Sequence, residues 1–123
     1  MTNFRKGKRF ETILKRKLIN RGFKVLKLAI PETADLVLIN KYPILIECKV
    51  SQSAVWYRKN NKQLERLRAY AIEGYFVFLA IKFTSNSTIK FFKLFDEYPF
   101  GANKGLSIDD FVNWCNRGEK NER

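Results

Sequence analysis

Residues 34–50 read ADLVLINKYPILIECKV. The segment holds two apolar runs, residues 35–39 and 44–50, with Asn40 and Lys41 ending the first and Pro43 opening the second. Short runs rich in Ile, Leu and Val are typical of strands, and so brief a connection predicts a hairpin of two antiparallel strands. The second run is almost continuously apolar, which indicates a strand that is buried on both faces.

Three charged residues stand within this predicted hairpin. Glu47 and Lys49 share one face of the second strand, because side chains alternate along a strand. Asp35 begins the first strand, and antiparallel pairing carries it back towards the end of the strand that holds Glu47. Two carboxylates and one ammonium are therefore expected at one end of a sheet, where ionised groups are costly to desolvate unless they are paired or metal-bound.

This arrangement matches the needs of phosphodiester hydrolysis. Carboxylate oxygens of Asp35 and Glu47 can hold Mg²⁺, which activates water and neutralises the scissile phosphate. Lys49 can orient that water or stabilise the charge that grows in the transition state. A structural ion pair at a strand end has the same residues, so the hairpin alone leaves both interpretations open.

The rest of the chain predicts one mixed α/β domain with five strands, in the order α-β-β-β-α-β-β-α. Helices are expected over residues 7–20, 61–73 and 107–115, and further strands over 23–29, 75–81 and 88–94. Gly22 and Gly74 follow the first two helices, and Ser107 is a candidate N-cap for the third. Residues 51–61 are expected to form a loop. The folded domain is predicted to span residues 1–117, followed by a disordered tail at 118–123.

The charge balance points to a polyanionic partner. Lys and Arg number 24 against 12 Asp and Glu, a net charge of +12 in 123 residues. Such an excess favours nucleic acid, although ribosomal-type packing proteins and proteins that bind anionic membranes share it. Basic side chains that flank the predicted site, and that are expected to contact DNA phosphates, are Arg5, Lys6, Lys8, Arg9, Arg58, Lys59 and Lys62.

The composition also excludes several classes of site. The chain has no His, and its two cysteines, Cys48 and Cys115, lie far apart in sequence, which argues against zinc fingers and excludes His-based catalysis. Any metal should therefore be a hard cation with oxygen ligands. The polar N-terminus and the lack of an apolar run of about 20 residues predict neither a secretory signal nor a membrane span. We expect a cytoplasmic protein (in the host cytoplasm if the source is viral) with no membrane partner and no small-molecule cofactor.

Several segments together resemble the archaeal Holliday junction resolvases, within the PD-(D/E)xK, restriction-endonuclease-like nucleases. The segments that carry the resemblance, in order and in spacing, are RKG at residues 5–7 before Glu11, RGFKV at 21–25, ADLV at 34–37 and IECKV at 46–50. The resemblance runs from about Arg5 to Leu94. It implies a restriction-endonuclease-like fold and a metal site formed by Asp35 and Glu47, with Lys49 beside it.

The resemblance adds three residues to the site. It implies that Glu11, which lies on the border of the apolar stripe of the first helix, assists the metal site. It places Lys27 where the family has an arginine, as a phosphate contact, and Gln63 where related nucleases have a polar residue that positions the water or Lys49. Two other positions depart from the family pattern, Thr12 in place of an arginine and Ala34 in place of a proline.

The function that the resemblance implies is resolution of four-way DNA junctions by paired symmetric nicks, with Mg²⁺ as cofactor or Mn²⁺ in its place. It also implies a homodimer that binds branched DNA. Independently, alternation on the last strands predicts that some of the many phenylalanines are exposed, and a twofold interface would cover them. Trp56 and Tyr57 are expected either to stack on bases or to anchor their loop.

Two alternatives to this function stay open. One is a restriction-like or repair nuclease that acts on other DNA structures. The other is a non-catalytic basic module that binds nucleic acid, which the intact Asp35, Glu47 and Lys49 argue against.

Overall fold

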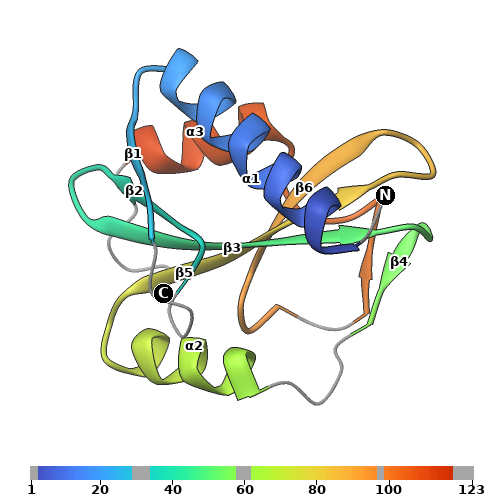
Figure 1. Ribbon diagram of the computed structural model, residues 1–123. Coiled ribbons are helices and arrows are strands. Elements are labelled where there is room, and N and C mark those ends of the chain that lie inside the picture. The colour runs from blue at the N-terminus through green and yellow to red at the C-terminus, as the bar shows by residue number, and fades with distance from the viewer. Residues whose placement is uncertain (1–2, 29–33, 58–61, 97–98, 118–123) are drawn as a thin grey trace.

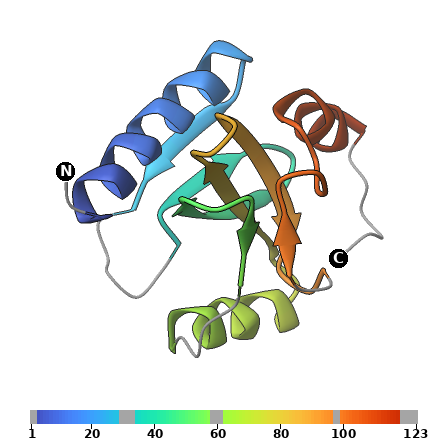
Figure 2. The ribbon, with the colours of Figure 1, turned by 90° about the vertical axis from the view of Figure 1, so that its right-hand side faces the viewer.

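The computed structural model describes residues 3–28, 34–57, 62–96 and 99–117, with the side chains of residues 3–6 and 62–64 left aside. A five-stranded sheet forms the middle layer of the protein. Helices α1 (Asn3–Asn20) and α3 (Ile108–Arg117) cover one face of the sheet, and α2 (Lys62–Ile72) covers the other (Figure 1 and Figure 2). The predicted mixed α/β domain is confirmed. The tail predicted at 118–123 lies outside the described residues.

The strand order of the sheet is β1-β2-β3-β5-β6. The pairs β1/β2, β2/β3 and β5/β6 are antiparallel, whereas β3 and β5 are parallel and are connected through α2. The strands are β1 Lys24–Lys27, β2 Leu36–Ile39, β3 Pro43–Ser51, β5 Phe76–Phe83 and β6 Thr88–Lys93. The predicted hairpin is thus present, and β3 is the central strand of the sheet, as its apolar character indicated.

The loop predicted for residues 51–61 is wrong in part. A short strand β4 (Val55–Trp56) pairs antiparallel with another short strand, β7 (Phe100–Gly101), and the two form a second sheet. Two residues are too few to show a strand period in the sequence. The pairing also depends on a partner more than 40 positions away in the chain, so local sequence signals did not reveal it.

The helix ends follow the predicted signals. Gly22 and Gly74 adopt positive φ angles of 96° and 103°, which end α1 and α2. The Ser107 side chain accepts a hydrogen bond of 3.1 Å from the Asp110 amide and caps α3. Helix α1 begins before Gly7, since one glycine costs a helix only about 1 kcal/mol. Among the described helices, none has the length and apolar character needed to cross a lipid bilayer.

Two apolar cores lie on the two faces of the sheet. One joins Phe10 and Leu14 of α1 to α3 and the sheet, and the other joins Leu67 of α2 to the opposite face. The prediction that several strand phenylalanines would be exposed is wrong, because both faces are covered. Five of the six that prompted it are at most 8% exposed, and only Phe95, at 57%, faces solvent. The phenylalanines of the last strands therefore fill the cores and do not by themselves require a dimer.

Candidate active site

Strand β3 places Glu47 and Lys49 on one face, as alternation predicted. Their side chains form an ion pair, with Lys49 Nζ 3.4 Å from Glu47 Oε2. The two groups differ in burial, because the Glu47 side chain is only 1% exposed while that of Lys49 is 23% exposed. A carboxylate is thus buried in the middle of the sheet, and the ammonium beside it reaches towards solvent.

Asp35 reaches this pair through the β2/β3 register. Leu36 pairs with Ile46, so Asp35, which directly precedes β2, lies next to the second half of β3. The Cys48 amide donates a hydrogen bond of 2.8 Å to Asp35 Oδ2, and the Asp35 carbonyl accepts one of 2.9 Å from the Leu28 amide. The Asp35 side chain is therefore held by β3, and its main chain is held by the residue that follows β1. The preceding Ala34, at 1% exposure, packs into the core below α2.

Helix α1 brings a third carboxylate to the site. Glu11 lies one position after the buried Phe10, on the border of the apolar face, and its side chain is 12% exposed. Lys27, at the end of β1, places its Nζ 3.4 Å from Glu11 Oε2. The prediction that Glu11 stands at the margin of the buried face is confirmed. Lys27 contacts Glu11 directly, a pairing that the sequence did not reveal because it depends on how α1 packs over β1.

Burial and the neighbouring Asp35 raise the pKa values of both glutamates. Burial is the main cause that raises the pKa of Glu47 to about 9, and the neighbouring Asp35 raises it further while Lys49 partly offsets the shift. Burial also raises the pKa of Glu11, again reinforced by Asp35 and opposed by Lys27. Asp35 is therefore the one carboxylate of the three that interacts electrostatically with both of the others. Burial raises the pKa of the Cys48 thiol well above its usual range, so this side chain is a neutral packing group.

The carboxylates leave two oxygen atoms that fit a cation. Glu11 Oε2 and Glu47 Oε1 are both buried, and neither accepts a hydrogen bond within the described residues. A buried oxygen that accepts no hydrogen bond is costly, even where an ammonium lies nearby, as Lys27 does 3.4 Å from Glu11 Oε2, and a divalent cation would compensate it. The donors are all hard oxygens, which suit Mg²⁺ or Mn²⁺. As the described side chains stand, however, no three of the Asp, Glu and Cys groups are arranged to hold one ion, and the two lysine ammoniums supply the nearby positive charge.

The remaining predicted residues lie around this centre or outside the described parts. Lys8 and Arg9 are exposed on α1, close in sequence to Glu11. Thr12 bonds its own helix, because its hydroxyl donates to the Lys8 carbonyl at 3.1 Å. Predicted residues whose side chains lie outside the described parts are Arg5, Lys6, Arg58, Lys59, Lys62 and Gln63.

The sequence also did not reveal a main-chain contact of the site, the hydrogen bond by which the Cys48 amide holds Asp35. No side-chain pattern could identify it, because a main-chain donor is present at every residue except proline. The only available signal was the hairpin register, which places Asp35 opposite residue 47 or 48.

Comparisons with known proteins agree with this geometry. A model of the family described as archaeal Holliday junction resolvase (Hjc) matches residues 2–113. A relative from Methanocaldococcus jannaschii, named crossover junction endodeoxyribonuclease Hjc, is 40% identical over 82 residues, which cover 65% of this chain and 61% of that protein. The matched region thus spans about three fifths of that relative.

A solved structure shares the fold. The Hjc Holliday junction resolvase of Archaeoglobus fulgidus superposes with a TM-score of 0.70 over 88% of this chain and 96% of that one, at 24% sequence identity. This likeness supports the restriction-endonuclease-like fold class expected from the sequence. Since the family model spans nearly the whole chain, from helix α1 into helix α3, the protein belongs to the archaeal Holliday junction resolvase family.

Proposed function

We propose that this protein is a metal-dependent endodeoxyribonuclease that resolves four-way DNA junctions by paired symmetric nicks. The observation that carries the proposal is the buried Glu47 carboxylate, which has one unsatisfied oxygen and lies beside Asp35 and Lys49. A fold gains no stability from such a group on its own. Its presence in a member of the resolvase family supports a catalytic role.

Glu11, Asp35 and Glu47 are the residues that would hold the metal, with Mg²⁺ proposed and Mn²⁺ compatible. The bound cation supplies Lewis acidity, which lowers the pKa of water and neutralises the scissile phosphate. The chain's own residues set the geometry around it. The Cys48 amide fixes Asp35, and Lys49, which is partly exposed, presents its ammonium to the phosphate or the attacking water. Gln63 is proposed to assist in positioning the water or Lys49.

Basic side chains are proposed to bind the DNA backbone. Lys8 and Arg9 are exposed on α1, the helix that carries Glu11, and Lys27 is 40% exposed beside that glutamate. Such residues neutralise phosphates without reading bases. Those proposed from the sequence alone are Arg5, Lys6, Arg58, Lys59 and Lys62. Selectivity for a branch would then rest on the shape and deformability of DNA.

The test compares a labelled four-way junction with linear duplexes of the same arm sequences, with and without Mg²⁺. We expect paired nicks confined to the junction and dependent on Mg²⁺. Cleavage of linear duplex at an equal rate would instead indicate a restriction-like or repair nuclease. Binding with no cleavage under any divalent metal would indicate a non-catalytic module.

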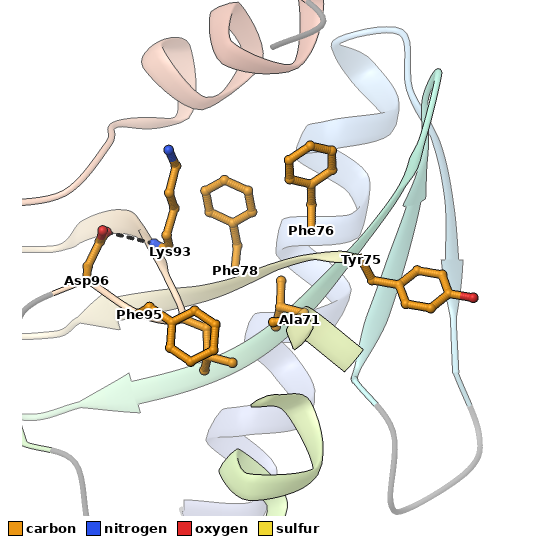
Figure 3. A pocket seen from close by; sticks show the side chains of 9 residues that line it. Ala71, Tyr75, Phe76, Phe78, Lys93, Phe95 and Asp96 are labelled. Atoms are coloured by element: carbon orange, nitrogen blue, oxygen red, sulfur yellow. Dashed lines mark hydrogen bonds between the residues drawn. The ribbon is translucent and has the colours of Figure 1, made fainter. Parts of the chain in front are cut away.

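The homodimer is proposed on a surface that includes only one of the phenylalanines that first suggested it, Phe95. At the end of α2, Ile72 is 79% exposed, and near it lie Tyr75 at 43% and Phe95 at 57%. A hollow of about 300 Å³ opens beside them. Figure 3 shows Ala71 and Phe95 together at this hollow, with Tyr75 pointing away from them and Phe76 and Phe78 directed to the opposite side of β5.

This surface supports twofold association because it carries both a projection and a hollow. In a twofold contact each surface meets its own copy, so the Ile72 side chain of one subunit can enter the hollow of the other, and the reverse. Burying these apolar side chains would remove a patch of the kind that monomers seldom expose. Two subunits would also supply the two active sites that paired nicks require.

Light scattering after size exclusion tests the dimer. We expect the wild-type mass to be twice the chain mass of 14.5 kDa and the mass of Ile72→Asp to fall to that of one chain. Ile19→Asp is the matched control, because Ile19 is also exposed, at 45%, but lies on α1, across the sheet from α2. A monomeric wild type, or a dimer that Ile72→Asp leaves intact, would contradict the interface.

A further inference from the structure

We propose that Tyr57 is a base-stacking residue that contacts an open base face at the branch point of the DNA. The inference rests on the proposed function, and it assigns a role to a side chain outside the carboxylate centre. Tyr57 is 64% exposed, the largest exposed fraction of any aromatic residue whose side chain is described. The chain segment before Tyr57 is firmly held, and it lies at an end of the molecule that carries basic residues.

The segment before Tyr57 is tied to the end of β3. The Ser51 side chain is buried, and its hydroxyl lies within hydrogen-bonding distance of two carbonyls, Ser53 at 3.1 Å and Val55 at 3.2 Å. The Ala102 amide donates a bond of 2.8 Å to the Ala54 carbonyl, next to the β4/β7 pairing. The turn that leads from Lys49 towards Tyr57 is therefore an ordered structure, fixed on both sides.

Trp56 anchors this segment to the core. Its ring stacks on Phe100 with centroids 5.9 Å apart and an interplanar angle of 21°, and Phe100 stacks on the buried Phe92 at 4.3 Å and 3°. Of the two roles considered for Trp56, the structure supports anchoring. Because side chains alternate along extended chain, the residue after an inward tryptophan points outwards. Tyr57 is thus presented to solvent by a support that reaches into the core.

Tyr57 follows β4 at the end of the molecule that bears basic residues. Strand β4 and the N-terminal part of α1, which carries Lys8 and Arg9, lie at the same end, towards which β3 runs from Glu47 to Ser51 (Figure 1 and Figure 2). In the sequence, Tyr57 is followed directly by Arg58 and Lys59. Proteins often bind single-stranded nucleic acid with an aromatic ring among basic side chains, where the cations contact the phosphates and the base stacks on the ring.

A branch point offers what such a ring requires. In a continuous duplex every base pair is stacked on both sides, so an exposed tyrosine has no open base face to cover. At a four-way branch, the innermost base pair of each arm can lose a stacking neighbour. A tyrosine ring held near the active-site strand can replace that neighbour, and this contact would favour junctions over linear duplex without reading sequence.

Binding measurements in metal-free buffer test the inference, with a four-way junction and a matched linear duplex. Tyr57→Ala should weaken junction binding about 5- to 150-fold, the range typical of one stacked base, while duplex affinity changes less than about twofold. Tyr57→Phe keeps the ring and should bind as the wild type does. Tyr42→Ala is the matched control, because Tyr42 is also exposed but precedes β3, at the other end of that strand.

A 2-aminopurine base at the branch point supplies a direct readout. Its fluorescence should be quenched by the wild type and by Tyr57→Phe, and much less by Tyr57→Ala. Equal losses on junction and duplex, an unchanged junction affinity of Tyr57→Ala, or a loss in Tyr57→Phe as large as in Tyr57→Ala would each overturn the stacking role. A wild type with no preference for junctions would contradict the proposed function as well, which separates the two failures.

Discussion

The two halves of β3 are built from one strand but have different surroundings. From Ile44 to Ile46 the strand pairs with β2 on one side and β5 on the other, and its residues are apolar. From Glu47 to Ser51 it pairs with β5, while β2 has already ended. At that point the Cys48 amide donates its hydrogen bond to the Asp35 carboxylate, where a neighbouring strand would otherwise supply the acceptor. The absence of a β2 partner is what leaves room for charged groups beside the second half.

Ile46 and Glu47 show the consequence most directly. They are neighbours in β3 and almost equally buried, at 0% and 1% exposure. The isoleucine lies in the apolar core below α1 and stabilises the fold, whereas the carboxylate loses hydration and keeps an unsatisfied oxygen. The first half of β3 therefore stabilises the sheet, whereas the second half destabilises the fold by burying a carboxylate.

The largest expected effect is on catalysis. Glu47→Gln should reduce junction cleavage on the order of 1,000-fold, about 4 kcal/mol of transition-state stabilisation, because the amide is a poor metal ligand. Binding of the uncut junction should persist. Single-turnover cleavage with Mg²⁺ and binding without it measure the two quantities, with the exposed Glu65→Gln of α2 as control. Full activity of Glu47→Gln would remove this residue from the metal site.

The next effect is on stability and belongs to the other half of the strand. Ile46→Ala should lower the free energy of unfolding by about 2–5 kcal/mol, through lost apolar burial and the cavity that is left. Urea denaturation at pH 7 measures it. The exposed Ile39→Ala, at the far end of β2 with 40% exposure, should cost much less. If the two substitutions had equal effects, the paired half of β3 would not be the stabilising region that the comparison describes.

The smallest effect is a gain of stability that depends on pH. The pKa of Glu47 is raised from 4.5 to about 9, so between these values the folded chain holds a proton that the unfolded chain releases. Stability should therefore fall as pH rises from about 4.5 to about 9 in the absence of metal. Glu47→Gln removes this loss of stability. The amide has no hydrogen-bond partners in the core either, which offsets part of the effect, so we expect the free energy of unfolding to rise by about 1–2 kcal/mol at pH 8.

Thermal melts in EDTA from pH 4 to pH 9 measure the difference between Glu47→Gln and wild type. It should be lowest at the acid end, where residue 47 is uncharged in both proteins and the unpartnered amide makes the variant the less stable one. It should grow with pH, to a gain in melting temperature of roughly 3 °C or more at pH 8. Added Mg²⁺ should raise the wild-type melting temperature and reduce the difference. A variant that is less stable than the wild type at pH 8 would show that the Glu47 carboxylate is compensated by the protein itself.

The sequence was sufficient to predict those parts of the site that lie on regular helices and strands. The strand pattern of residues 35–50 was sufficient to pair Asp35 with the second half of β3 and to place Glu47 and Lys49 on one face. Helical spacing likewise placed Glu11 on the border of a buried stripe. Each of these inferences needs only the geometry of one helix or one hairpin, which the order of apolar residues encodes.

The features that were missed depend on contacts between distant elements. The β4/β7 pairing joins Trp56 to Phe100, and the Lys27–Glu11 contact depends on the packing of α1 over β1. The expectation of exposed phenylalanines failed because it assumed one solvent face for the last strands, whereas helices and β7 cover both faces. In each case the decisive information is the position of a second element, which no local pattern contains.

The hydrogen bond from the Cys48 amide to Asp35 has a consequence for how this protein can evolve. Since the donor belongs to the main chain, any amino acid except proline can provide it. The position of Asp35 therefore does not depend on the Cys48 thiol, which is part of the apolar core. Lineages can exchange residue 48 among small apolar types, and protein engineers can remove this oxidisable group, while the carboxylate keeps its place.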